Sequence, residues 1–341
     1  MTGFAWLVAV VVVSAGLMTW GLRRYALARS LMDIPNARSS HSVPTPRGGG
    51  VAIVLSFLCA VLALTITGRA EPGLSWAILG AGALVAVVGF VDDHRHLAAR
   101  WRLLAHFVAA AWVLAWLGGA PRLDWFGATV DLGWFGATIA AVYLVWLLNL
   151  YNFMDGIDGI ASVEAISVCA GGAVLYWFVG RADLMAQPLL LAAAVVGFLF
   201  WNFPPAKIFM GDAGSGFLGI ALGILSLQAA SVSPALLWSW LILLGVFVVD
   251  ATWTLLRRLV RGERVYEAHR SHAYQRASRR WGGHLPVTLT VAAINLFWLL
   301  PISLCVGAGL LDGVVAIAIA YAPLLVIAFV LGAGAPDGAI S

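Results

Sequence analysis

The chain has 341 residues, of which 62% are hydrophobic and 11% charged, and its formal net charge at pH 7 is +4. An ordinary soluble domain is about half apolar and about a quarter charged, so the composition excludes that class and predicts an integral membrane protein. We therefore expect the lipid bilayer as a partner and no nucleic acid. Cys59, Cys169 and Cys305 lie in apolar runs and indicate neither disulfides nor a zinc site.

Apolar segments recur along the whole chain. In the first, Phe4 to Trp20, the basic residues Arg23 and Arg24 follow the run, the reverse of the order in a cleavable signal peptide. We therefore expect a permanent membrane span. The full pattern predicts an all-α membrane protein with about eleven spans. Their ranges are 3–22, 48–67, 74–91, 103–119, 134–150, 160–180, 186–202, 214–230, 235–256, 288–308 and 313–331. The range 186–202 is short enough for a tilted or broken helix.

The basic residues predict how these spans are oriented. Seventeen of the twenty Lys and Arg fall in alternate loops, and Arg69, Arg122 and Arg181 fall in the others. The positive-inside rule places the seventeen in the cytoplasm, with the N-terminus outside and the C-terminus cytoplasmic. We expect a single membrane domain over 1–341 without internal repeats. Its functional cytoplasmic loops are near 23–47, 92–102, 149–159, 202–213 and 257–287.

The first two polar motifs follow spans one and three. The loop 33–50, DIPNARSSHSVPTPRGGG, is irregular because of its prolines and glycines, and it reads as a connector or as a phosphate-binding loop using Arg38, His41 and Arg47. Asp92 and Asp93 end an apolar helix. Carboxylates are unfavourable at a helix C-terminus, so this pair indicates a function such as Mg²⁺ binding or general base catalysis.

The stretch NLYNFMDGIDGI, 149–160, places Asn152, Asp155 and Asp158 three residues apart after span five. It does not match a calcium-binding loop. Capping of the next helix explains Asp158 and leaves the other two unexplained.

Next, MGDAGSG opens span eight with a glycine-rich turn, and a helix N-terminus favours a phosphate. Asp212 beside that phosphate requires a divalent cation between them, so Asp212 is the leading Mg²⁺ ligand.

The last cytoplasmic loop carries HRSHAYQRASRR, 269–280. His269, His272 and Arg276 share one face if the segment is helical, which indicates a cationic lid over phosphates, whereas Arg279 and Arg280 suit a solvated loop facing anionic lipid. Asp250, inside span nine, is explained either by an ion pair with Arg257 and Arg258 or by contact with a substrate. All the other polar motifs lie at cytoplasmic ends of spans, which predicts one cytoplasmic site.

Five motifs in this order resemble one enzyme family. PTPRGGG, the Asp-Asp pair, NFMDGIDG, FMGDAGS and HRSHAYQR are similar to the motifs of polyprenyl-phosphate N-acetylhexosamine-1-phosphate transferases. This is the glycosyltransferase family 4 group, which includes phospho-N-acetylmuramoyl-pentapeptide transferase. The fuller patterns around RSSHSVPTPRGGG and HRSHAYQR resemble the branch that initiates O-antigen or similar polysaccharides. The histidine-rich motif of the muramoyl-pentapeptide enzymes differs from HRSH.

The resemblance implies a reaction and its partners. A UDP-N-acetylhexosamine gives its sugar 1-phosphate to undecaprenyl phosphate in the bacterial plasma membrane and releases UMP, with Mg²⁺, or Mn²⁺ in its place, as cofactor. A monomer and a homodimer both remain open.

The resemblance also implies roles for individual residues. Asp212 matches the metal ligand, with Asp155 as a second. Asp92, with Asp93 beside it, matches the proposed base, and Asp158 joins them as a catalytic residue. Asn152 and Asp155 match positions near the nucleotide, and His269, Arg270 and His272 match the diphosphate motif, with Arg38, His41 and Arg47 as further substrate-binding residues. A phosphate monoester is already mostly dianionic at pH 7, so Asp92 fits a positioning role as well as a base.

Three alternatives stay open. The first is the muramoyl-pentapeptide donor. The second is a secondary transporter, which predicts midplane acids and a repeat. The third is a non-catalytic lipid scaffold, in which Asp212 beside the glycine-rich turn would be unnecessary.

Overall fold

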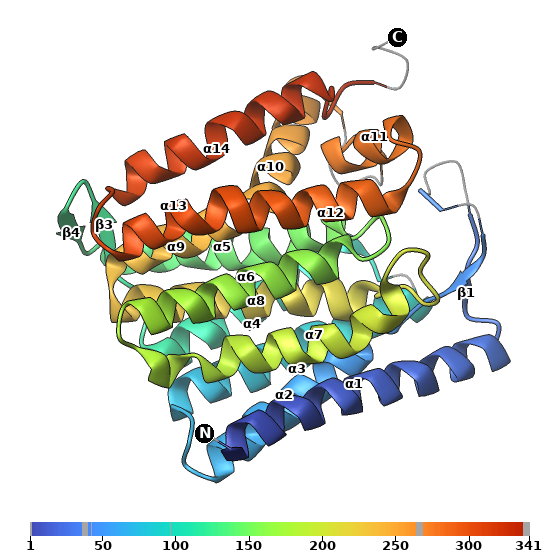
Figure 1. Cartoon of the computed structure of the whole chain (residues 1–341), viewed down its shortest axis with the longest axis horizontal. Helices are drawn as coiled ribbons and strands as arrows, with labels where there is room; N and C mark the ends of the chain where they lie inside the picture. The colour runs from blue at the N-terminus through green and yellow to red at the C-terminus, as the bar shows by residue number, and fades with distance from the viewer. Residues whose placement is uncertain (1, 36–39, 42, 96, 264–268, 337–341) are drawn as a thin grey trace.

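The protein is a bundle of helices that run roughly side by side, with most loops gathered at two ends (Figure 1). The computed structural model describes the chain except residues 1, 36–39, 42, 96, 264–268 and 337–341. The prediction of an all-α membrane protein is confirmed, with two short antiparallel ladders added. These pair β1 (Met32–Asp33) with β2 (Thr45–Pro46) and β3 (Leu123–Trp125) with β4 (Ala128–Val130). We call the end with β1 and β2 the polar end and the end with β3 and β4 the opposite end.

The helices alternate in direction between these two ends. The first eight are α1 (Thr2–Ala28), α2 (Val51–Ile66), α3 (Pro72–Arg95), α4 (Ala99–Leu117), α5 (Gly133–Met154), α6 (Ile160–Phe178), α7 (Ala186–Asn202) and α8 (Asp212–Val232). The others are α9 (Pro234–Leu243), α10 (Gly245–Val260), α11 (Ala273–Arg280), α12 (His284–Ile294), α13 (Leu300–Gly307) and α14 (Gly313–Val330). A 3₁₀ turn, η1 (Ala182–Leu184), precedes α7, and a π-helical segment, η2 (Asn295–Leu299), joins α12 to α13.

Each of the eleven predicted ranges coincides with a helix or with a joined pair of helices. Eight helical segments of the described chain are long and apolar enough to cross a membrane, or nine if α9 and α10 form one span. Helix α2 is shorter, and α4 is not among them, so the number eleven stays a prediction. Helix α7 is unbroken. The helix predicted over 235–256 is a pair of helices, because the chain bends by 74° between α9 and α10.

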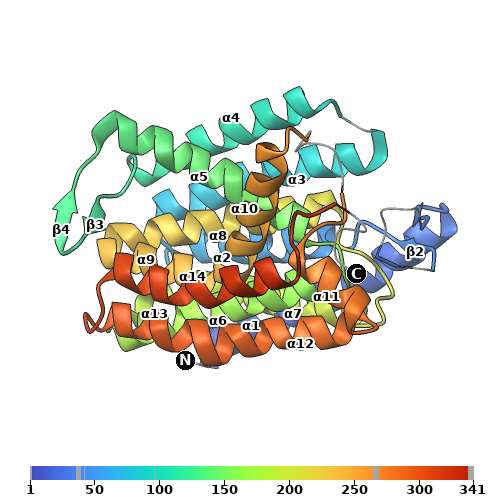
Figure 2. The ribbon, with the colours of Figure 1, turned by 90° about the horizontal axis from the view of Figure 1, so that it is seen from above.

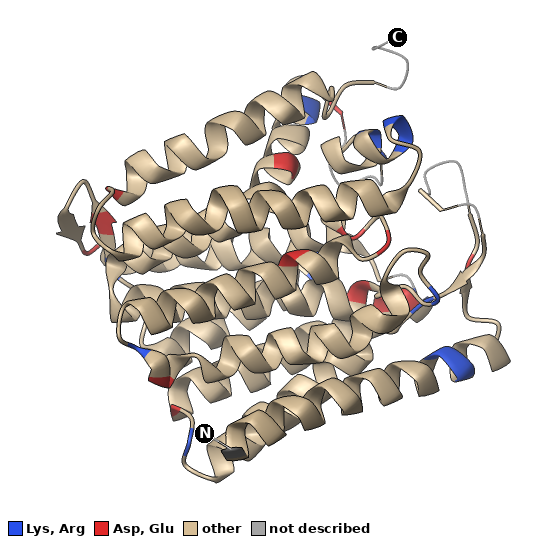
Figure 3. Ribbon diagram, viewed as in Figure 1, with Lys and Arg blue, Asp and Glu red and all other residues tan. Residues whose placement is uncertain are grey.

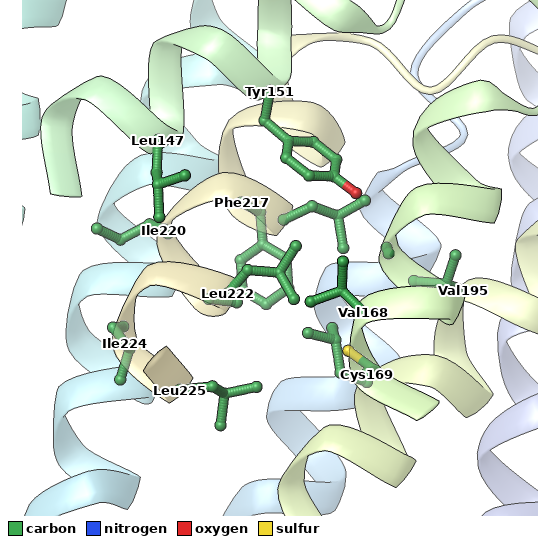
Figure 4. Close-up of a cluster of buried hydrophobic side chains, with 14 of the residues drawn as sticks. Leu147, Tyr151, Val168, Cys169, Val195, Phe217, Ile220, Leu222, Ile224 and Leu225 are labelled. Atoms are coloured by element: carbon green, nitrogen blue, oxygen red, sulfur yellow. The ribbon is translucent and has the colours of Figure 1, made fainter. Parts of the chain in front are cut away.

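Helix α8 forms the centre of the bundle. It packs against α3 and α5 and also contacts α2, α6 and α9. Of its apolar 18-residue stretch, 83% is buried. Figure 4 shows the core on its side: Phe217, Ile220 and Leu222 of α8 lie near Tyr151 of α5 and Val168 of α6. The glycine-rich start of α8 is therefore fixed by the most buried helix of the protein.

The outer surface of the bundle suits a lipid environment. Helix α1 lies at the edge of the bundle (Figures 1 and 2). Only 17% of its apolar 18-residue stretch is buried, and Trp6 and Leu17 are largely exposed. Lipid tails solvate such side chains as well as a protein core does. Charged residues of the described chain gather mostly at the two ends, and the polar end holds the larger group (Figure 3).

Candidate functional site

A cavity of about 230 Å³ opens at the polar end, where segments distant in the sequence meet. Its lining includes Asp93 from the end of α3, Asn152 from the last turn of α5, and Asp212 from the first turn of α8. The loop after α5 contributes Asp155 and Asp158, the β1–β2 connection contributes His41, and Arg47 follows β2. Residues of the first four polar motifs thus meet at one cavity.

The two adjacent aspartates of α3 have separate partners. Asp93 lies at the N-terminus of α8, where the amides of Asp212 and Ala213 donate to its carboxylate at 3.3 and 3.4 Å. A carboxylate is favoured there by the free amides and by the helix dipole. Asp93, which is unfavourable at the C-terminus of α3, therefore caps the N-terminus of the central helix α8. Arg47 donates to the backbone carbonyl of the same Asp93 and ties the first loop to this junction.

Asp92 points into a second cavity. It forms an ion pair with Arg102 at the start of α4 and accepts a hydrogen bond from the Leu97 amide at 2.6 Å. The second cavity, of about 200 Å³, is lined by Asp92, Arg102 and His106 together with apolar side chains such as Val85 and Leu148. Its mixed lining suits an amphiphile with a charged group and an apolar chain.

Asp212 stands where the two cavities meet, since it lines both of them together with Asn152. Asn152 Nδ2 donates to Asp212 Oδ1 at 2.9 Å and to Ser215 Oγ at 3.0 Å. The guanidinium of Arg102 lies 4.0 Å from the other Asp212 oxygen, and the Asp212 side chain is 39% exposed. This carboxylate is therefore held in place and remains open to a ligand from either side.

The stretch NLYNFMDGIDGI forms the wall of the first cavity. Asp155 ends α5, and Gly159, at φ 74°, turns the chain into α6, a conformation that glycine adopts without strain. Gly156 allows a close approach: a Cβ there would lie 2.1 Å from Tyr274 Oη. Gly159 thus allows the turn into α6, and Gly156 allows α11 to pack closely against the loop.

The two carboxylates of this loop differ in environment. Burial and the nearby Asp212, Asp93 and Asp158 raise the pKa of Asp155 well above its ordinary value. Burial also acts to raise the pKa of Asp158, but hydrogen bonds from His284 and from the Ala206 amide outweigh it and lower that pKa below its ordinary value. Asp158 is thus a paired anion, whereas Asp155 lies in an excess of negative charge that a cation would relieve.

His284 is a site residue that the sequence analysis missed. Its Nδ1 lies 3.1 Å from Asp158 Oδ1, and its Nε2 lies 3.0 Å from the Ser40 carbonyl oxygen. It therefore joins the first loop to the loop after α5. The sequence offered only a lone histidine just before a predicted span, and a lone histidine is no signal on its own.

In the motif of the last loop, His269, His272 and Arg276 do not line the first cavity, whereas Gln275 does. Helix α11 begins at Ala273 and His272 is its N-cap, so the segment is not helical at His269 and the condition for one helical face of His269, His272 and Arg276 is not met. His269 stacks on His272 with ring centroids 4.7 Å apart. Burial, with nearby His272 and Arg258, lowers the pKa of His269 to about 3, so it is neutral at pH 7. Arg270 is half-buried beside this pair and outside the cavity lining.

Asp250 explains the position of α11. Its carboxylate accepts from the amides of Ala273 at 2.9 Å and Tyr274 at 3.0 Å, and it lies 3.3 Å from His272 Nδ1. The structural interpretation of Asp250 therefore fits, with His272 and α11 as its partners rather than the arginines after it. From α11, Tyr274 Oη donates to the Phe153 carbonyl, and Gln275 reaches the cavity.

The first loop contributes basic groups to the cavity. The His41 ring packs edge-on against Phe209 with centroids 4.8 Å apart, and its buried Nε2 has no hydrogen-bond partner in the described part of the chain. A buried nitrogen without a partner, in a residue that lines a cavity, fits a site for a polar ligand. Arg38 lies outside the described residues.

The oxygen donors fit a magnesium ion only with help from a substrate. No three His, Cys, Asp or Glu side chains of the described residues stand close enough together to hold a metal by themselves. Mg²⁺ characteristically takes one or two carboxylates and completes its shell with water and substrate phosphates. Asp212 and Asp155 have the carboxylate oxygens that fit such an ion.

Comparisons with known proteins find relatives of this chain. Residues 75–230 match the profile of glycosyl transferase family 4. A decaprenyl-phosphate N-acetylglucosaminephosphotransferase of Mycobacterium leprae is 30% identical over 292 residues, 75% of this chain and 72% of the relative. A probable undecaprenyl-phosphate N-acetylglucosaminyl 1-phosphate transferase of Bacillus subtilis is 29% identical over 262 residues, with the same shares. A phospho-N-acetylmuramoyl-pentapeptide-transferase of Moorella thermoacetica is 32% identical over 232 residues, 62% of this chain and 69% of the relative.

Proposed function

The chain belongs to glycosyl transferase family 4, and from this premise we propose that it transfers an N-acetylhexosamine 1-phosphate from a UDP-sugar to undecaprenyl phosphate. The products are UMP and a lipid-linked sugar that begins a cell-envelope polysaccharide of the O-antigen type. The printed names of the relatives support a polyprenyl phosphate acceptor and a sugar phosphate donor. The sugar and the polysaccharide are part of the proposal.

One observation carries this function: a polar cavity and a partly apolar cavity meet at Asp212. The first has the charged and amide groups that suit a nucleotide diphosphate. The second combines Arg102 and His106 with Val85, Val88 and Leu103, which suits a lipid phosphate and the start of its chain. A soluble donor and a lipid acceptor can therefore reach one point from different sides.

The reaction at that point is a phosphoryl transfer. A lipid phosphate oxygen forms a bond to the phosphorus next to the sugar, the diphosphate bond of the UDP-sugar breaks, and the bonding electrons leave with UMP. Because the lipid phosphate is already mostly dianionic at pH 7, the protein has little proton transfer to do. Its main contributions are in-line positioning and neutralisation of charge.

The residues divide these tasks between them. Arg102, held by Asp92, faces the acceptor phosphate, while Arg47 and His41 face the donor. Asp212 and Asp155 would hold Mg²⁺, which when bound supplies positive charge between carboxylates and phosphates. Asn152 keeps Asp212 oriented between the two substrates.

We also propose that the polar end faces the cytoplasm of a bacterial cell, at the plasma membrane. Arg69, Arg122 and Arg181 lie in the loops of the opposite end, and the other described Lys and Arg lie at or near the polar end. The positive-inside rule supports this orientation, and UDP-sugars are cytoplasmic substrates.

The test uses purified protein in detergent with undecaprenyl phosphate, Mg²⁺ and a panel of UDP-N-acetylhexosamines that includes the UDP-muramoyl-pentapeptide. We expect UMP and a lipid-linked sugar phosphate in equal amounts, lost with a chelator and restored by Mg²⁺ or Mn²⁺. Asp212→Asn and Asp92→Asn should abolish both products while the protein still inserts. Full activity of both variants would overturn the site, and turnover of the pentapeptide donor alone would select the rival substrate.

A further inference from the structure

A groove on the outer surface of the bundle lies between α1 and α7. Its volume is about 610 Å³, and none of its lining residues lines either cavity of the site. The two helices pack closely beside it, because a Cβ at Gly197 would overlap the Val12 carbonyl oxygen. Its apolar wall is formed by Val12, Val13, Leu17, Trp20, Phe200 and Trp201.

The extent of the groove matches one leaflet of a bilayer. It follows α1 from Val12 to Trp20, which is about 12 Å along the helix axis. One leaflet of the hydrocarbon core is about 15 Å deep. Trp20 and Trp201 lie at the end of the groove that is nearer the polar end. Because tryptophan is enriched where lipid headgroups begin, the groove suits an acyl chain that enters the membrane from the polar end.

Three cations surround the end of the groove at these tryptophans, which we call its charged end. The Arg24 guanidinium lies over Trp20, 4.8 Å from the ring centroid. Lys207 Nζ lies over Trp201 at 5.7 Å, and Arg23 Nε donates to the Lys207 carbonyl at 3.2 Å. Within the described chain, none of the three cations forms an ion pair with a carboxylate. The charged end therefore has positive charge that an anionic ligand would neutralise.

A second copy of the chain fits this groove poorly. In a two-fold dimer the same surface of both copies meets across the axis, and in a membrane both copies have the same orientation. The charged ends of the two grooves would then face each other, and like charges repel. A lipid with a negative headgroup brings the opposite charge to the same place, and such lipids are attracted by basic residues next to membrane helices.

We propose that the groove between α1 and α7 binds an anionic phospholipid of the leaflet at the polar end. The phosphate lies between Arg24 and Lys207, and an acyl chain lies along α1 against Leu17 and Val13. This lipid is distinct from the acceptor, because the groove shares no lining residue with the second cavity. Its headgroup contacts the connection between α7 and α8, where the neighbouring Ala206 amide donates to Asp158.

The test locates the lipid on the full chain without measuring turnover. The protein is reconstituted in phosphatidylcholine vesicles that contain a small fraction of phosphatidylglycerol with a photoreactive acyl chain. We expect crosslinks to the groove segments of α1 and α7, and competition by unlabelled phosphatidylglycerol. The same photoreactive chain on phosphatidylcholine should label these segments at least about tenfold less. Equal labelling by the two lipids, or no labelling of the groove by either, would overturn the proposal.

The headgroup contact is tested by removing its cations. One basic residue near an anionic lipid headgroup strengthens binding about fivefold, so Lys207→Gln should weaken labelling by about that factor. The double variant with Arg24→Gln should weaken it about twenty-fivefold. Arg100→Gln is the matched control, because it removes another cation that lies over an exposed tryptophan, Trp101, outside the groove. It should stay within about twofold of the wild type, and wild-type labelling of the double variant would contradict the proposal.

The acyl-chain contact is tested by filling the groove while its charge stays the same. Val13 lines the groove and is 59% exposed, so Val13→Trp occupies the space of the chain without entering the core. Labelling should fall at least about tenfold. Val10→Trp is the control, because Val10 is 58% exposed on the same helix and does not line the groove. Equal labelling of these two variants would show that the chain lies elsewhere.

Two rival occupants are decided on the same vesicles. If undecaprenyl phosphate displaces the label as well as the same concentration of phosphatidylglycerol does, the groove belongs to the acceptor and the proposal is overturned. If a cysteine at Leu17 crosslinks two copies of the chain and the groove stays unlabelled, a second copy covers it and the proposal is likewise overturned. Neither readout depends on the transfer of any sugar, so failure of the proposed function leaves this test intact.

Discussion

The acidic residues at the two ends of the bundle find their partners in different ways. At the opposite end each partner is close in sequence. Asp183 pairs with Arg181 at 2.8 Å, Asp312 accepts from the first amides of its own helix, and Glu71 accepts from Gly73 and Leu74. Such caps and pairs complete local structure and contribute little to stability.

At the polar end the partners are far apart in sequence. Asp93 caps a helix that starts 119 residues later, Asn152 holds a carboxylate 60 residues away, and Asp158 meets a histidine 126 residues away. These contacts draw several carboxylates together, which costs free energy unless a ligand compensates. At the two ends of the bundle, acids whose partners are distant in sequence therefore mark the candidate site, and acids whose partners are local do not.

The largest expected effect comes from making the same substitution at the two ends of the bundle. We expect Asp212→Asn to lower turnover by about a thousandfold, because it removes the carboxylate at the junction of the two cavities while keeping the side chain's shape. Asp183→Asn, the same change at the opposite end, should leave turnover within about twofold. The measurement is UMP release by the two purified variants at saturating substrates. Equal rates in the two variants would show that the two ends are functionally alike.

Much of the fold could be predicted from the sequence, because the lipid environment leaves few choices. Apolar runs of sufficient length gave the helices, and each predicted range coincides with a helix or a joined pair. The bend at Leu244 could not be predicted, because no proline or glycine pair marks it and the run stays apolar on both sides. One support of the bend, the hydrogen bond from Tyr321 to the Leu241 carbonyl, comes from another helix.

The meeting of polar residues at one end of the bundle could be predicted from the sequence, but the partners of each residue could not. The convergence of Asp93, Asn152 and Asp212 followed from their places at the ends of spans. The sequence could not separate the roles of Asp92 and Asp93, since adjacent residues on a helix point in different directions and meet different neighbours. Nor could it show that His272 turns toward Asp250, because that contact depends on the tertiary fold.

A smaller loss should follow from replacing a cation of the site. We expect Arg102→Gln to lower turnover by about tenfold to a hundredfold, since Arg102 holds Asp92 and lies 4.0 Å from Asp212. Arg181→Gln removes an arginine of similar exposure from the opposite end and should change turnover by less than about twofold. Steady-state kinetics with varied lipid acceptor decide this, and a Michaelis constant for the acceptor that stays at the wild-type value would argue against Arg102 as its contact.

A third prediction concerns the docking of α11. In Gly156→Ala the new Cβ would lie 2.1 Å from Tyr274 Oη, so α11 or the loop must move. We expect a destabilisation of about 1–3 kcal/mol and a loss of turnover of about tenfold. Gly21→Ala is the control, because a Cβ at Gly21 meets nothing within 4 Å.

A double variant sharpens this test. Tyr274→Phe removes the hydroxyl that the alanine would meet, so adding it to Gly156→Ala should recover part of the lost stability. If the double variant is no better than Gly156→Ala alone, the shortest contact is not the cause of the defect. Thermal unfolding in detergent and UMP release are measured on the same samples.

The smallest expected effect is a pH dependence of the protein's stability that comes from His269. His269 has its pKa lowered to about 3 by burial and by its neighbours His272 and Arg258, whereas an unfolded histidine titrates near its ordinary value of 6.5. Between these values the unfolded chain binds a proton that the folded chain does not, so His269 makes the protein less stable as the pH falls below about 6.5. We expect His269→Gln to lose less thermal stability than the wild type between about pH 7 and about pH 5, by a few degrees at most. An equal loss in both proteins would mean that His269 is already protonated in the folded state, as a cationic lid would require.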